Sequence, residues 1–231
     1  MPAVAVIAVV VGAVAQAASG LGFALVCGPV LIATLGQHEG VRVAVLLSAG
    51  LNAVMLAREF RAVRWVDGAY LLVPAVVATP LLVPLVDRMD TTTASLVAGV
   101  LTVLAAVALL VGLRVPMLRG RAGAAVAGVV GAGMNVVAAI SGPAVALYTG
   151  NADWSAPSVR ATMQAIFLLL NVVLLAVKGV PSVSGWLVVA VAGGYAAGVL
   201  LTRWMTDEVA RRATLLLAAA GGAALVARAA L

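Results

Sequence analysis

Two glycine–proline pairs interrupt long apolar stretches of the sequence, and each pair can create a binding site for an anion. Gly28-Pro29 lies within residues 1–37, and Gly142-Pro143 lies within residues 122–152. Proline lacks an N–H and suits the first position of a helix, so we expect each pair to break one helix and begin another. The N–H groups at such a start carry a partial positive charge and bind anions without a lysine or arginine.

A polar stripe follows the second pair. Arg160, Gln164, Phe167 and Asn171 are spaced by four, three and four residues, which places them on one face of a helix. A polar face on a helix within lipid must point to the bundle interior or to water. Such a face can line a substrate site, or it can only hold helices together by hydrogen bonds. The same two interpretations apply to the other polar candidates, which are Asn52, Asn135, Ser141 and Tyr148.

The composition indicates what kind of chain positions these residues. Of the 231 residues, 65% are hydrophobic and only 10% are charged, whereas about 25% charged residues are usual in soluble proteins. This composition excludes soluble enzymes, nucleic-acid-binding domains and disordered linkers, and it indicates an integral protein of the lipid bilayer. The single cysteine, Cys27, excludes an intramolecular disulfide and a cysteine-built metal site. No cofactor is expected.

Charged residues divide the chain into eight apolar stretches. Runs such as 96–112 show no period of two, and backbone groups in lipid must pair within the segment, so the stretches are expected to be helices. The stretches are residues 1–37, 43–57, 68–86, 91–113, 122–152, 161–177, 179–202 and 213–227. We therefore predict an all-α integral membrane protein of about eight transmembrane helices.

The order of the stretches suggests an internal repeat. The first and fifth stretches are too long for one straight span, and each is followed by a short one. Gly-Pro pairs and glycines recur at offsets of 114 or 111 residues, as Gly28/Gly142, Pro29/Pro143, Gly36/Gly150, Gly20/Gly131 and Gly22/Gly133. We predict two four-helix repeats, residues 1–113 and 122–231, whose first helices are broken by Gly and Pro and which are joined by a basic cytoplasmic linker at 114–121. An even number of spans makes the repeats parallel.

The distribution of positive charge predicts the orientation. With both termini and the connections after the second, fourth and sixth spans in the cytoplasm, the whole formal net charge of +6 lies inside. This arrangement puts Glu59 and Lys178 inside, and Asp87 and Arg160 outside. The expected protein is a multi-pass protein of the plasma membrane with both termini cytoplasmic.

The second repeat resembles a known family. Residues 141–148, read as Ser-Gly-Pro-Ala-Val-Ala-Leu-Tyr, together with Arg160-Ala161-Thr162, Phe167 and Asn171, resemble a signature of the TauE/SafE sulfite exporters, also called toluenesulfonate uptake permeases. Gly20-Leu21-Gly22-Phe23 with Gly28-Pro29 is similar to the family's first repeat, and residues 193–198 resemble its seventh helix. The chain departs from the family in a thinner first glycine cluster and in Ala144, where a second proline is common. The resemblance implies transport of sulfur-containing or related small organic anions.

Three other functions fit parts of the pattern. A non-transporting membrane scaffold or assembly factor fits the composition. An intramembrane serine protease would need a histidine near Ser141, but the single His38 lies in the polar connection 37–40. A cation or amine exporter would need a carboxylate in mid-span, whereas Asp67 and Asp87 lie at the ends of the third span.

The sequence therefore predicts a non-enzymatic transporter of a small anion, without nucleic-acid or metal partners and compatible with a homodimer. The expected substrate-binding residues are Gly20, Gly22, Gly28, Pro29, Asn52, Asn135, Ser141, Gly142, Pro143, Tyr148, Arg160, Gln164 and Asn171.

Overall fold

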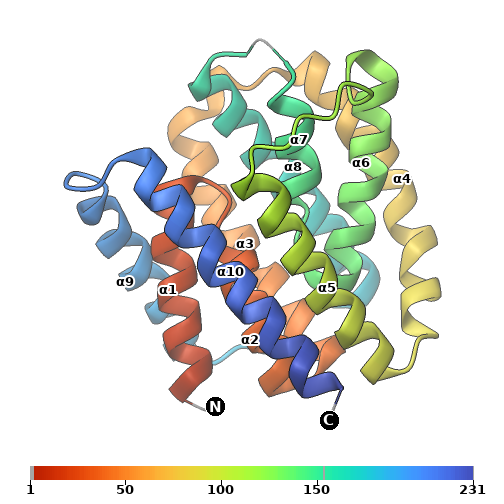
Figure 1. Cartoon of the computed structure of the whole chain (residues 1–231), viewed down its shortest axis with the longest axis vertical. Coiled ribbons are helices and arrows are strands. Elements are labelled where there is room, and N and C mark those ends of the chain that lie inside the picture. Colours follow the sequence, from red (N-terminus) through yellow and green to blue (C-terminus); the bar gives the residue numbers. More distant parts are fainter. Residues whose placement is uncertain (1–2, 153, 231) are drawn as a thin grey trace.

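The computed structural model describes residues 3–152 and 154–230, and within them the chain is all-α, as expected (Figure 1). The elements are α1 (Ala3–Ser19), α2 (Phe23–Leu35), α3 (Gln37–Glu59), the 3-10 helix η1 (Phe60–Ala62), α4 (Trp65–Asp87), α5 (Thr91–Leu110), α6 (Gly120–Ala138), α7 (Gly142–Thr149), α8 (Ala156–Lys178), α9 (Gly185–Leu201) and α10 (Asp207–Ala229). In this part of the chain, six helices are long and apolar enough to cross a membrane: α3 with η1, α4, α5, α6, α8 and α10.

Local sequence explains where several of these helices begin. The side chains of Asp90, Ser155 and Thr206 accept hydrogen bonds from backbone N–H groups of the first turns of α5, α8 and α10. Such caps satisfy N–H groups that have no partner within the helix. Prolines inside α4 do not end it, because neighbouring helices in an apolar bundle compensate for a lost backbone hydrogen bond.

The first long apolar stretch folds as a hairpin of α1 and α2. A Cβ added to Gly12 would lie 2.9 Å from the carbonyl oxygen of Phe23 and 3.2 Å from Cβ of Cys27, so α2 runs back along α1. The chain reverses at Gly20, whose φ of +79° favours glycine. The expected break at Gly28-Pro29 is wrong. Pro29 lies inside α2, where packing against α1, α3 and α10 supports the helix.

The second long stretch contains the corresponding hairpin of α6 and α7. The helix α7 begins at Gly142 with Pro143 in its first turn, and Ala139 has a positive φ of 63°. Gly20 and Ala139 are 119 residues apart. The residues that directly precede α2 and α7, Gly22 and Ser141, are also 119 apart and have nearly equal backbone angles. The same offset relates α3 to α8. The offsets of 114 and 111 residues that the sequence suggested are therefore wrong.

Among the described residues, each half contains five α-helices, not four spans, because its first stretch turns back on itself. The first half runs from the side of the N-terminus to the opposite side, and the second half returns (Figure 1). Helix α4 packs on α6 as α9 packs on α1, while α3 packs on α8 and α5 on α10. This exchange of partners relates the two halves by an approximate two-fold axis. The expected parallel arrangement is wrong, since an odd number of helices reverses the direction of the second half.

Contacts between helix ends define two faces of the molecule. On the termini face, Nζ of Lys178 lies 2.7 Å from the carboxylate of Asp87, and both chain ends lie on this side (Figure 1). On the opposite face, Nη2 of Arg160 lies 3.2 Å from Oε1 of Glu59. Both ion pairs join residues that the sequence-based orientation placed on opposite sides of the membrane. The predicted assignment of these four residues to the two sides of the membrane is therefore wrong. The reason is that each hairpin adds one reversal of the chain that the prediction of eight straight spans did not include.

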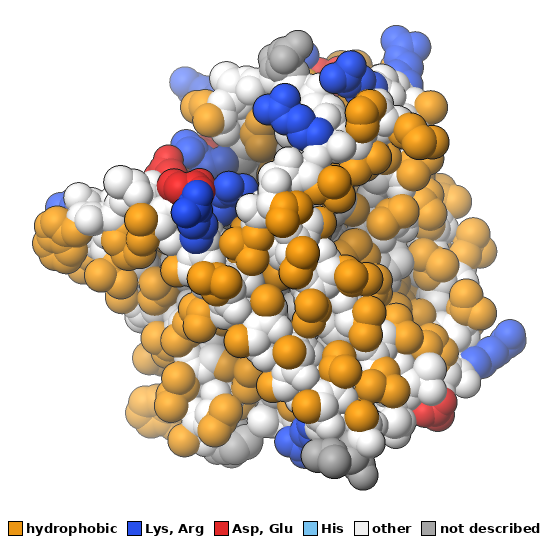
Figure 2. Space-filling view, viewed as in Figure 1, with side chains coloured by type: hydrophobic (Ala, Val, Ile, Leu, Met, Phe, Trp, Pro, Cys, Tyr) orange, Lys and Arg blue, Asp and Glu red, His pale blue; other side chains and the backbone are white. Residues whose placement is uncertain are grey.

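The face opposite the termini, here called the arginine-rich face, carries most of the 14 Lys and Arg residues. They are Arg58, Arg61, Arg64, Arg114, Arg119, Arg121, Arg160, Arg203, Arg211 and Arg212. Hydrophobic side chains cover the middle and lower part of the surface in Figure 2, whereas Lys and Arg gather toward its upper part. The surface thus has an apolar belt with an uneven distribution of charge on its two sides.

Candidate functional site

A small cavity of about 20 Å³ lies between the two helix breaks. The first break contributes Leu21 and Ala24 to its lining, and the second contributes Ala139, Ser141 and Gly142. This volume is about the room of one water molecule. We refer to it as the central cavity. It is the point at which the two inverted halves meet around polar groups.

A network of amides holds the first break in place. Nε2 of Gln164 donates to the carbonyl oxygen of Gly20 at 2.7 Å. Nε2 of Gln16 lies 3.2 Å from the same oxygen and 3.2 Å from Oδ1 of Asn52. The N–H of Phe23, at the start of α2, donates to Oε1 of Gln16 at 3.0 Å. All three amide side chains are buried, so the network fixes the carbonyl at the reversal and one N–H of the new helix.

The second half repeats this pairing in simpler form. Nδ2 of Asn135 on α6 donates to Oδ1 of Asn171 on α8 at 3.2 Å. The two residues are 36 positions apart, as are Gln16 on α1 and Asn52 on α3. Sequence reasoning missed Gln16 and its neighbour Ser48, another residue of the cavity lining. The equal separation of the two amide pairs was the signal that could have found Gln16.

The central cavity offers hydrogen-bond donors that no protein group occupies. Ser141 is 5% exposed and Asn171 is 2% exposed, and both line the cavity. Among the described residues, Oγ of Ser141 and Nδ2 of Asn171 have no hydrogen-bond partner. Oδ1 of Asn135, behind Asn171, is sealed from solvent and also lacks a partner. Buried donors are almost always paired in folded proteins, so these two donors are available to a hydrogen-bond acceptor in the central cavity.

A second and larger cavity of about 770 Å³, the vestibule, opens at the arginine-rich face. Its lining includes the charged residues Arg58, Glu59, Arg160, Asp207 and Arg211. Residues 19–21, at the first helix break, also belong to its lining. Leu21 lines both the vestibule and the central cavity, so the two cavities are neighbours at this residue.

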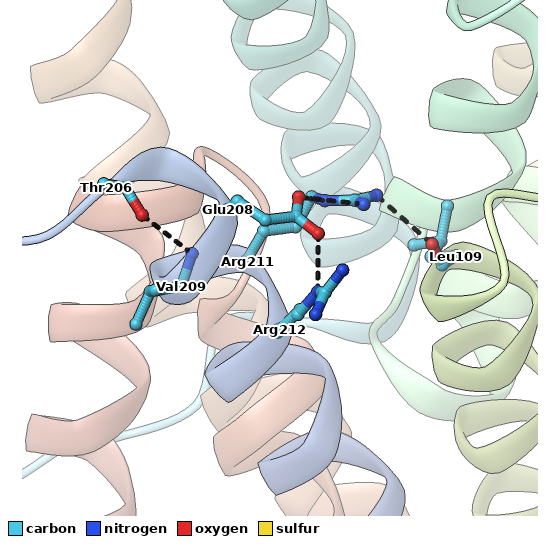
Figure 3. A network of polar contacts seen from close by, with 6 residues as sticks. All are labelled: Leu109, Thr206, Glu208, Val209, Arg211 and Arg212. Carbon is cyan, nitrogen blue, oxygen red and sulfur yellow. Dashed lines mark hydrogen bonds and ion pairs between the residues drawn. The ribbon is translucent and has the colours of Figure 1, made fainter.

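The cations of the vestibule are held by neighbouring groups. Arg160 pairs with Glu59, and its aliphatic part lies beside the break, since a Cβ added to Gly20 would be 3.8 Å from Cδ of Arg160. Arg211 donates to the carbonyl oxygen of Leu109 at 3.2 Å and pairs with Glu208 at 3.2 Å (Figure 3). These bonds join the start of α10 to the end of α5 at the vestibule wall.

The structure brings together part of the predicted site. Gly20, Asn52, Gln164, Asn171, Ser141 and Gly142 surround the central cavity or belong to its amide network. Of the polar stripe on α8, Gln164, Phe167 and Asn171 face the interior, whereas Arg160 is exposed and lines the vestibule.

Other predicted residues lie elsewhere. Gly22 packs against Ala15 and Thr214. Tyr148 makes an edge-on contact with Trp154, with ring centroids 6.0 Å apart. Gly28 packs against the carbonyl oxygen of Ala138.

The arrangement of nucleophiles and bases does not suit hydrolysis. Ser141 lines the central cavity, whereas Nδ1 of His38 lies 3.5 Å from Asp87 on the termini face. Within the described ranges, no group of three or more His, Cys, Asp or Glu side chains could hold a metal ion. The chemistry available at the centre of the molecule is hydrogen-bond donation to a bound molecule.

Comparison with known proteins gives one match. A family model described as "Sulfite exporter TauE/SafE" matches residues 4–226. No curated protein and no solved structure matches the chain.

Proposed function

The chain belongs to the TauE/SafE sulfite exporter family, which confirms the resemblance noted in the sequence, and from this premise we propose that it is a permease for sulfite, sulfonates or related small anions. The anion binds at the central cavity, between the two helix breaks, and the cavity of about 20 Å³ widens to admit it. The observation that carries this proposal is the pair of free donors, Ser141 Oγ and Asn171 Nδ2, in a buried cavity.

The chemistry of the site favours an anion over a cation. The residues that line the central cavity include amides and hydroxyls but no carboxylate. The helices α2 and α7 begin at this cavity, and helix starts favour negative charge. A cation at this site would face hydrogen-bond donors and no carboxylate. Its positive charge would therefore stay unpaired in a low-dielectric interior, which is energetically costly.

The vestibule provides the route by which the anion reaches this site. Arg58, Arg160 and Arg211 raise the local concentration of anions, and movement of Leu21 connects the vestibule to the central cavity. On the termini face, the pair of Lys178 with Asp87 and the bond from Arg42 to the carbonyl oxygen of Gly179 join α3, α4 and α8. These contacts support a conformation open only to the arginine-rich face.

The uneven charge supports one orientation in the membrane. The positive-inside rule favours a cytoplasmic arginine-rich face, which puts both termini outside, opposite to the sequence-based expectation. With the protein in the plasma membrane in this orientation, the vestibule opens to the cytoplasm. An inside-negative potential favours anion exit by about 2.3 kcal/mol per charge per 100 mV, so export is the favoured direction.

The two halves act as the moving parts of this permease. We assign them to residues 1–113 and 122–231, joined by the cytoplasmic linker 114–121, whose last two residues already begin α6. Inverted halves can exchange their conformations, and this exchange opens the same central site to the other side. Assembly as a homodimer stays a prediction of the sequence.

Flux from proteoliposomes tests the proposal. Purified protein should move sulfite and methanesulfonate much faster than protein-free liposomes do, and it should not move choline, a cation of similar size. A protein that moves none of these anions would instead fit the non-transporting scaffold. A protein that moves choline would contradict the anion site.

A further inference from the structure

The central cavity contains no charged side chain to balance a ligand's charge. Its lining residues are Gln16, Leu21, Ala24, Leu25, Ser48, Ala139, Ile140, Ser141, Gly142, Phe167 and Asn171. Arg160 and Arg211 lie in the vestibule, where Arg160 is paired with Glu59 and Arg211 with Glu208. A bound anion is therefore stabilised only by the dipoles of neutral donors and by the partial positive charge of the helix starts.

From this composition we propose that the site accepts monovalent oxyanions and rejects divalent ones, an inference that rests on the proposed function. Each helix start is equivalent to roughly half a positive charge. The starts of α2 and α7 together supply about one unit, which balances one negative charge and leaves a second one uncompensated. The desolvation cost of an ion rises with the square of its charge, so a dianion loses far more than it gains.

The free donors support the same limit. Ser141 Oγ and Asn171 Nδ2 are dipoles without net charge, and both are more than nine-tenths buried. They can orient two oxygens of an oxyanion but cannot neutralise it. For sulfite, which interconverts between hydrogen sulfite and the divalent ion near neutral pH, hydrogen sulfite is then the transported form.

The test compares three anions in proteoliposomes across the pH range in which hydrogen sulfite ionises. Methanesulfonate is monovalent throughout this range and sulfate is divalent throughout, so they serve as fixed-charge references. Protein-free liposomes correct for passive leak. Sulfite flux, divided by methanesulfonate flux at the same pH, should fall about tenfold for each pH unit above that ionisation. Sulfate flux should stay at the leak rate.

Two results would overturn the inference while the proposed function stands. One is sulfite flux that stays constant or rises with pH relative to methanesulfonate. The other is sulfate flux comparable to that of methanesulfonate. Absence of flux for every anion would instead remove the proposed function and the inference with it. The reversal potential of sulfite flux should correspond to one charge per molecule at every pH, and a value of two charges would overturn the inference as well.

Discussion

At the scale of single residues, the proposed selectivity depends on where buried donors are left free. Gln16, Asn52 and Gln164 form hydrogen bonds with one another and with the Gly20 carbonyl oxygen. Ser141 and Asn171 keep donors available to the central cavity. This division assigns the first three residues to holding the break and the last two to holding the ligand.

Removing the Ser141 hydroxyl separates these roles. Ser141→Ala leaves every recorded protein hydrogen bond intact, so the stability of the protein should be unchanged. A hydrogen bond to a charged ligand contributes about 1.5–3 kcal/mol, so we expect the anion concentration for half-maximal flux to rise roughly tenfold or more. Thr79→Val, which removes an equally buried hydroxyl on α4, is the control and should transport normally. Unchanged flux in Ser141→Ala would exclude the hydroxyl as a ligand.

A methyl group at Gly142 tests the central cavity itself. The added Cβ would lie 3.5 Å from Cβ of Leu21 and 3.7 Å from Cζ of Phe167, which are ordinary contacts, so Gly142→Ala should fold. It should nevertheless lower flux strongly, because it fills part of a cavity of about 20 Å³. Gly193→Ala, with open space around the added Cβ, is the matched control.

Gly22→Ala should fail in a different way. Its Cβ would lie 2.7 Å from side-chain atoms of Ala15 and Thr214, so we expect a loss of folded protein measured by size-exclusion chromatography.

If Gly142→Ala transports at the wild-type rate, the anion does not occupy the central cavity.

At the scale of elements, the two reversals decide the architecture, and they are the features that the sequence predicted least well. The spacing of Gln164, Phe167 and Asn171 correctly predicted an inward face of α8, because helical periodicity is a local property. The Gly28-Pro29 pair suggested a break that packing overrides. The second reversal involves Ala139, and alanine ordinarily favours a helix. The sequence alone gives no sign that Ala139 has a positive φ.

The strained alanine leads to a stability prediction. A non-glycine residue in the left-handed region costs roughly 1–2 kcal/mol, and glycine removes this cost. Ala139→Gly should therefore raise the midpoint of thermal unfolding in detergent, whereas Ala138→Gly, one residue earlier in α6, should lower it by about 1 kcal/mol of stability. Destabilisation by Ala139→Gly would show that the residue is not held at this backbone angle.

At the scale of the whole molecule, the inverted halves change which residues share a side of the membrane. The sequence correctly indicated an all-α protein with long apolar helices. It could not reveal the side of each connection, because one unrecognised reversal moves every later segment to the opposite side. The ion pairs of Lys178 with Asp87 and of Arg160 with Glu59 supply that information.

Cysteine labelling in intact cells checks this topology. In a Cys27→Ala background, cysteines at Arg61 and Arg119 should be protected from a membrane-impermeant reagent. Cysteines at Arg88 and Ser182 should react, because both lie at the termini face. Ser182 is the decisive position, since the alternation of eight spans would place it at the cytoplasmic end of the seventh span. Protection of Ser182→Cys together with labelling of Arg88→Cys would contradict the inverted halves.

The central claim is that the anion binds where the two helix reversals meet, and a structure determined with bound anion tests it most directly. Selenite, the heavier analogue of sulfite, can be located by its anomalous scattering. We expect one selenium peak in the central cavity, with anion oxygens within hydrogen-bond distance of Ser141 Oγ and Asn171 Nδ2. A peak beside Arg160 or Arg211 in the vestibule, with the central cavity unchanged at a saturating selenite concentration, would contradict the claim.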